Sequence, residues 1–314
     1  MRSQTPETSA QIAKRTGRPL EGLEQKLLSM GQRGELWAYQ LDGVWTFKMM
    51  PWLVGIYEFQ VNRMDREFAA MVDEYRQHLG PVLIGFRPHI TQVIPIEEAI
   101  PASQEALTYN QVSDLIEKAR SFKLTECICK KRRGLLGKPC SKPTEVCLIM
   151  DTMPGVLESS STGGLVITRE EACEVLRQAE DAGLVHLTGN VENGPWFICN
   201  CCGCCCGQLR PAVPGIPNVV NSHYYAKIDP ELCTACGICA DERCQVNAIQ
   251  RGDEFYAVIT ERCIGCGLCA TKCPAEAVTM VPKKPEELSI TPKDEDAWLE
   301  ERGRRRGVDF NKFK

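Results

Sequence analysis

The chain has 314 residues, of which 43% are hydrophobic and 25% are charged, and its formal net charge is −4. This length suffices for two or three compact units, and a slightly acidic chain has no global attraction to nucleic acid or to an anionic membrane. No apolar run approaches the ~18 residues of a membrane span, and the first residues lack the apolar stretch of a secretory signal. We therefore expect a cytoplasmic protein without a membrane span.

The cysteine-free N-terminal part is predicted to form two helices and then two strands, at 9–17, 19–34, 36–41 and 44–49. Asp42-Gly43 between the strands is a hairpin signal, and a long helix is expected at 61–79. The order helix, turn, helix and two-stranded wing resembles winged helix-turn-helix domains, so we predict a winged-helix-like domain at 1–90.

Such domains often bind DNA, but the charge of the second helix argues against it. That helix carries Lys26 against Glu21 and Glu24, whereas a DNA reader needs positive charge for phosphate contacts. Protein docking or formation of a homo-oligomer through this domain is the favoured role, and DNA binding is the less favoured one.

The rest of the sequence is rich in cysteine: it contains all nineteen cysteines of the chain, from Cys127 to Cys273. In a cytoplasmic chain they indicate metal binding or redox chemistry rather than disulfides. The segment 91–155 is predicted to be a connecting segment that contains the first four of them, Cys127, Cys129, Cys140 and Cys147. The basic run from Lys130 to Arg133 is read either as a solvated turn or as a surface that tunes a cluster or docks an acidic redox partner.

Residues 156–215 are predicted to form a second winged-helix-like element with a cysteine-rich loop. Thr168 to Glu171 are a capping box, Gly183 ends the following helix, and strands are expected at 184–188 and 196–198. This arrangement returns the loop toward the first four cysteines. The loop, CNCCGCCCG, contains Cys199, Cys201, Cys202, Cys204, Cys205 and Cys206.

These ten thiols together are expected to hold one or more additional iron–sulfur centres, with a zinc site and redox-active thiols as the alternatives. Cys173 lies in the middle of the predicted helix and is assigned to the core. The tripeptide Cys201-Cys202-Gly203 is similar to the CCG element of heterodisulfide-reductase-type cluster domains, which implies a substrate-binding cluster.

Two further cysteine runs have the C-x2-C-x2-C spacing that wraps a loop around three corners of a cubane. They also form an internal repeat, since AKIDPELCTACGIC aligns with AVITERCIGCGLC. The segment 223–282 resembles a bacterial-type two-[4Fe–4S] ferredoxin domain, and two zinc sites are the alternative. The resemblance implies one cluster held by Cys233, Cys236, Cys239 and Cys273, and a second held by Cys263, Cys266, Cys269 and Cys244. Gln245 stands where such domains usually have proline, which affects the local turn at Cys244.

The fold class that follows is α+β multidomain, with an extended charged tail at 283–314. As a whole, residues 20–280 resemble a group of multidomain 4Fe–4S binding proteins from anaerobic bacteria and archaea. The resemblance rests on GIYEFQVNRMDRE, on ECIC with its two following cysteines, on FICNCCGCCCG and on the ferredoxin repeat.

We predict an iron–sulfur electron-transfer protein with two [4Fe–4S] clusters and one or more further centres, working with redox partner proteins. The sequence has no dinucleotide or P-loop motif, and no residue is assigned as catalytic. A reductase whose catalytic cluster lies in the cysteine-rich middle is the first alternative, so whether the protein is an enzyme stays open. A redox-sensing transcriptional regulator is the second alternative.

Overall fold

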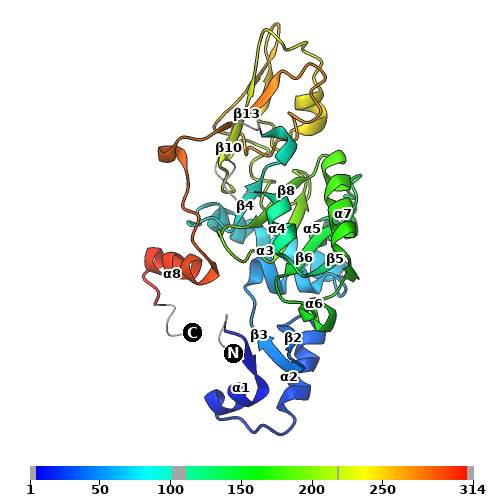
Figure 1. Ribbon diagram of the computed structural model, residues 1–314, viewed down its shortest axis with the longest axis vertical. Helices are drawn as coiled ribbons and strands as arrows, with labels where there is room; N and C mark the ends of the chain where they lie inside the picture. Colours follow the sequence, from blue (N-terminus) through cyan, green and yellow to red (C-terminus); the bar gives the residue numbers. More distant parts are fainter. Residues whose placement is uncertain (1–4, 101–110, 218, 310–314) are drawn as a thin grey trace.

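The computed structural model describes residues 5–100, 111–217 and 219–309 (Figure 1). The N-terminal unit lies at one end of the long axis, a sheet with its helices occupies the centre, and the two ferredoxin-like runs lie at the other end. None of the helices in these residues combines the length and apolarity that crossing a bilayer requires.

The N-terminal unit follows the predicted order of elements and adds one short strand. It comprises β1 (Glu7–Thr8), α1 (Ser9–Thr16), α2 (Leu23–Gln32), β2 (Trp37–Leu41) and β3 (Val44–Lys48), with sheet order β1-β3-β2. The Thr8 hydroxyl accepts the N–H of Gln11, whose side chain in turn accepts the N–H of Thr8, so a capping box begins α1. Ile12, Leu27 and Phe47 form its core. The unit is therefore a small helix–sheet module, and its winged-helix character stays a prediction.

A connecting region leads from this unit to the central sheet. It contains two short helical turns, η1 (Trp52–Ile56) and η2 (Glu58–Gln60), and the long helix α3 (Arg66–Ile84). Tyr57, Val61 and Val72 pack against Ile128, so this region closes over the start of the helix that carries Cys129.

The central sheet has six strands in the order β4-β8-β9-β6-β5-β7, and every neighbouring pair is antiparallel. The strands are β4 (Thr91–Ile94), β5 (Ser121–Glu126), β6 (Glu145–Asp151), β7 (Leu165–Ile167), β8 (Val185–Gly189) and β9 (Phe197–Cys201). The helical elements around it are η3 (Glu97–Ala99), α4 (Val112–Lys118), α5 (Ile128–Leu135), α6 (Val156–Ser159) and α7 (Arg169–Asp181).

This sheet differs from the domain division expected from the sequence. The helix and hairpin of the second winged-helix-like element are present as α7, β8 and β9, and the capping box at Thr168 and Glu171 is made. However, β9 pairs with β6, and β8 pairs with β4, so strands from 91–155 and 156–215 share one sheet. A two-stranded wing has two unpaired edges, and pairing on both sides satisfies them. The two segments thus form one α+β unit.

The ferredoxin-like region combines two antiparallel strand pairs. β10 (Tyr224–Ile228) pairs with β13 (Val278–Pro282), and β11 (Ile249–Arg251) pairs with β12 (Tyr256–Val258). η5 (Cys239–Arg243) follows the first cysteine run. The internal repeat seen in the sequence therefore corresponds to two loops held between paired strands.

Residues 295–306 form a helix rather than the extended tail expected from their composition. η6 (Pro285–Glu287) precedes it, and the Asp294 carboxylate accepts the N–H of Ala297 to begin α8 (Glu295–Arg306). Acidic residues in the first turn and arginines in the last stabilise this short helix through its dipole. The Trp298 indole N–H donates to the His89 carbonyl oxygen at 2.7 Å, and Lys48 pairs with Glu295 at 2.9 Å. The tail thus packs on its own chain beside the central sheet (Figure 1).

His223, near the start of the ferredoxin-like region, makes stability depend on pH. Its side chain is 6% exposed, and burial, together with the nearby Lys283 ammonium, lowers its pKa to about 4. Because the unfolded chain protonates this imidazole below about pH 6.5 and the folded chain does not, stability is fully present above that pH and falls toward pH 4. We expect a loss of about 2 kcal/mol between pH 7 and pH 5.

The measurement is the melting temperature of the full chain at both pH values. His223→Gln should flatten the dependence, whereas His78→Gln, at an exposed position on α3, should retain it. Equal slopes in all three proteins would contradict this assignment.

Candidate metal centres

The eight cysteines of the ferredoxin-like region surround two small cavities. One cavity is lined by Cys233, Cys236, Cys239 and Cys273. The other is lined by Cys244, Cys263, Cys266 and Cys269. Each set contains three cysteines from one run and the fourth from the other, which is the grouping that the ferredoxin resemblance implies.

Backbone N–H groups point at two thiols of the second cavity, and glycines in the left-handed region curl the loops of both cavities. The N–H of Ala226 donates to the Sγ of Cys263 at 3.4 Å, and the N–H of Ala248 donates to the Sγ of Cys244 at 3.2 Å. Gly237 and Gly267, equivalent in the repeat, have φ of 85° and 81°, which curls each loop toward its thiols. These thiols and N–H groups fit a [4Fe–4S] cluster, which four thiolates hold and hydrogen bonds to sulfur tune.

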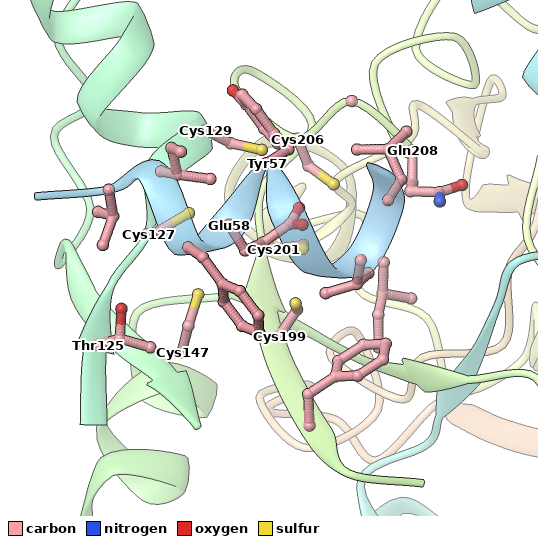
Figure 2. Close-up of a pocket in the computed structure, with 18 of the residues that line it drawn as sticks. Tyr57, Glu58, Thr125, Cys127, Cys129, Cys147, Cys199, Cys201, Cys206 and Gln208 are labelled. Atoms are coloured by element: carbon pink, nitrogen blue, oxygen red, sulfur yellow. The ribbon is translucent and has the colours of Figure 1, made fainter. Parts of the chain in front are cut away.

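Six of the remaining cysteines face one mainly apolar cavity of about 120 Å³ (Figure 2). Cys127 and Cys129 lie at the start of α5, Cys147 lies on β6, and Cys199 and Cys201 lie on β9. Because Cys199 and Cys201 lie two residues apart on a strand, their side chains point to the same face. Cys206 completes the set from the turn that follows β9, where its N–H donates to the Cys202 carbonyl oxygen at 3.1 Å.

The six thiols contact one another in a series, in the order Cys129, Cys127, Cys147, Cys199, Cys201 and Cys206. The hydrogen bond with Cys127 and burial raise the pKa of the Cys129 thiol. Hydrogen bonds from Cys147 and Cys201 instead lower the pKa of Cys199, which lies near the middle of the series. So many thiols in a buried apolar space fit an iron–sulfur centre, since metal binding replaces their protons.

Two residues that the sequence did not mark also line this cavity. Figure 2 shows the Glu58 carboxyl extending among the sulfur atoms. This carboxyl accepts the Gly55 N–H at 2.7 Å, and burial raises its pKa to about 8. The Tyr57 hydroxyl is buried and has no hydrogen-bond partner among the described residues, and burial raises its pKa. Both lie in GIYEFQVNRMDRE, but only the family resemblance pointed to that segment, because their residue types and spacing carry no metal signature.

Arginines gather beside the same cavity. Arg76 lines it, and Arg132, which is 0% exposed, pairs through Nη1 with Asp73. Burial, and then the positive charges of Arg133 and other arginines nearby, lower the pKa of Arg210. The basic run Lys130–Arg133 is therefore not a solvated turn, because it lies on α5 with its first and third residues buried. Its positive charge offsets the negative charge of thiolates in the cavity.

The other four cysteines form a separate group outside this cavity: Cys140, Cys202, Cys204 and Cys205. Their Sγ atoms all lie within 4.8 Å of one another. The ten cysteines expected to act together are thus divided into a set of six and a set of four. Cys173 belongs to neither and packs against the core beside α7, as predicted.

The ferredoxin-like region and the cavity share one hydrophobic core. Cys199, Cys201 and Cys206 pack on the same buried residues, including Val246 and Leu268, as three cysteines of the second cavity, Cys244, Cys263 and Cys266. The Ile96 N–H also donates to the Cys266 carbonyl oxygen at 3.1 Å. The second ferredoxin-like site therefore faces the six-cysteine cavity, while Cys236 of the first site is exposed.

Comparison with known proteins gives a match to the second of the two ferredoxin-like cysteine runs. No curated protein matches the sequence. Residues 256–279, which contain Cys263, Cys266, Cys269 and Cys273, match the 4Fe-4S binding domain family. The chain carries a 4Fe–4S binding domain in this segment, and its cysteine-rich remainder agrees with an iron–sulfur protein.

Proposed function

We propose that the chain transfers electrons one at a time between a redox partner protein and a centre in the six-cysteine cavity. The eight cysteines of the ferredoxin-like region would hold two [4Fe–4S] clusters, and the six cavity cysteines would hold a third iron–sulfur centre. When bound, such clusters take up and release single electrons at potentials set by hydrogen bonds, charge and burial.

The observation that carries this proposal is the hydrophobic core shared by the ferredoxin-like region and the six-cysteine cavity. Cysteines of the second ferredoxin-like site and three of the cavity cysteines pack on the same buried side chains. Electron tunnelling between two centres needs a short separation, and the shared core places the two cysteine groups close together. A module that served only as a free carrier would have no need to bury one of its two sites against a cysteine-lined cavity.

The opposite end of the ferredoxin-like region is the place for a partner. Cys236 is exposed, and so is Leu232 beside it. A partner that docks here would approach the first site without disturbing the cavity. The first ferredoxin-like site is thus accessible to a partner, and the second is enclosed beside the cavity.

Iron and acid-labile sulfide per chain, measured on anaerobically isolated protein, test the number of centres. We expect about 12 iron atoms, since three [4Fe–4S] centres supply four each, and EPR of the dithionite-reduced protein should show more than two interacting clusters. About eight iron atoms would contradict a cluster in the cavity.

A reductase is the second candidate, and the cavity itself favours it. It is enclosed largely by apolar side chains, as most small-molecule sites are, and the Tyr57 hydroxyl in it lacks a protein partner among the described residues. Reoxidation of the reduced chain by a small-molecule acceptor, with no partner protein present, would favour this candidate over electron transfer alone.

A further inference from the structure

The sulfur atoms of the four cysteines outside the cavity lie closer together than those of the other cysteine groups. We propose that Cys140, Cys202, Cys204 and Cys205 form a closed, mononuclear Zn²⁺ site. This inference goes beyond the proposed function and does not depend on it, because zinc has no redox chemistry and would take no part in electron transfer.

The separation of the sulfur atoms carries the proposal. The Sγ of Cys204 lies 3.2 Å from that of Cys202, 3.6 Å from that of Cys140 and 3.6 Å from that of Cys205, and Cys140 lies 3.8 Å from Cys202. Four thiolates around one zinc at about 2.3 Å are separated by about 3.8 Å, from the geometry of a tetrahedron. A cubane places four irons between its thiolates, so its ligands stand farther apart.

The ferredoxin-like sites provide an internal comparison. Among the described residues, which include all nineteen cysteines, only the set of four has three or more potential ligand atoms within 4.8 Å of one another. The two quartets that line the ferredoxin-like cavities have wider spacing, as a cluster requires. In the large cavity, too, no three of the six described sulfur atoms lie within 4.8 Å of one another, although neighbours in the series are in contact. The chain therefore contains two distinct thiol spacings.

Position and surroundings agree with a structural site. None of the four cysteines lines the large cavity, and protein supplies all four ligands, so no place remains for a substrate or water. The Lys130 side chain is 2% exposed and its positive charge lies near Cys202, where it would offset part of the charge of a four-thiolate site. The site would tie the loop before β6 to the turn after β9.

Metal analysis of the full chain, isolated without oxygen, tests the proposal. We expect about one zinc per chain in the natural protein. Cys204→Ala, at the most accessible ligand, should lose the zinc and keep the iron, and Cys199→Ala should lose iron and keep the zinc. Cys173→Ala, outside every group, should change neither.

X-ray absorption at the zinc edge of the unmodified protein identifies the zinc ligands directly, so it tests the proposal even where a variant fails to fold. Four sulfur neighbours at about 2.3 Å, with no iron neighbour, are expected. A zinc content far below one atom per chain, or an iron atom beside the zinc, would overturn the proposal. A loss of iron in Cys204→Ala would overturn it as well, since it would show that the set of four holds part of an iron–sulfur centre.

Discussion

Replacing Cys199 by serine is expected to remove about four iron atoms per chain while the two ferredoxin-like clusters remain. Cys199 lies near the middle of the series, between Cys147 and Cys201, and hydrogen bonds with both lower its pKa. A serine hydroxyl stays protonated at neutral pH and is a harder ligand. The centre that depends on this position should therefore be lost or bound weakly.

Iron analysis and EPR of the reduced protein measure this effect, and Cys173→Ser is its matched control. Cys173 is a partly buried cysteine on α7 outside all the groups, so its replacement should leave both readouts unchanged. The variant should also lose electron exchange between the ferredoxin-like clusters and any acceptor that acts at the cavity. Full iron content in Cys199→Ser would argue against a cavity centre.

Replacing Arg243 by leucine is expected to destabilise the chain by about 3–5 kcal/mol. This side chain is 6% exposed and joins the ferredoxin-like region to the central unit. Its Nε donates to the Leu268 carbonyl oxygen at 3.1 Å, and its Nη atoms donate to the carbonyl oxygens of Asp181 at 3.0 Å and Glu180 at 2.7 Å. Leucine would remove all three donations; the Glu180 oxygen would keep the Gly183 N–H and the Leu268 oxygen the Thr271 hydroxyl, but the buried bridge between the two regions would be lost.

Lys272→Met is the control at the same interface. Lys272 pairs with Asp181 at 2.8 Å, but both side chains are largely exposed, so water replaces the contact readily. Urea unfolding followed by absorbance of the clusters and by circular dichroism measures both variants. We expect the ferredoxin-like region of Arg243→Leu to unfold at lower urea, and equal midpoints for the two variants would contradict the role given to Arg243.

Local patterns in the sequence were enough for the ferredoxin-like sites. Two residues between cysteines fix a loop of defined curvature, and the two quartets meet around separate cavities as the resemblance implied. The helix beginning after Thr168 was likewise predictable, because its capping box involves residues only three apart. Both features depend on neighbours in the chain.

The division of the ten middle cysteines was not predictable, because it depends on pairing between distant strands. The register of β6 against β9 brings Leu148 opposite Ile198 and so sets Cys147 near Cys199. The spacing of the loop cysteines does not predict which of them point into the cavity and which point away from it. The burial of Glu58 has the same origin, since it follows from packing of a distant segment over α5.

The division of the cysteine-rich loop between two groups has a consequence for how the protein matures. Cys199, Cys201 and Cys206 face the cavity together with Cys127, while Cys202 faces away toward Cys140. The set of four is complete only after residue 205 and the set of six after residue 206. The second ferredoxin-like quartet is complete after Cys269 and the first after Cys273. Cofactor insertion into the six-cysteine cavity therefore requires at least the first 206 residues of the chain.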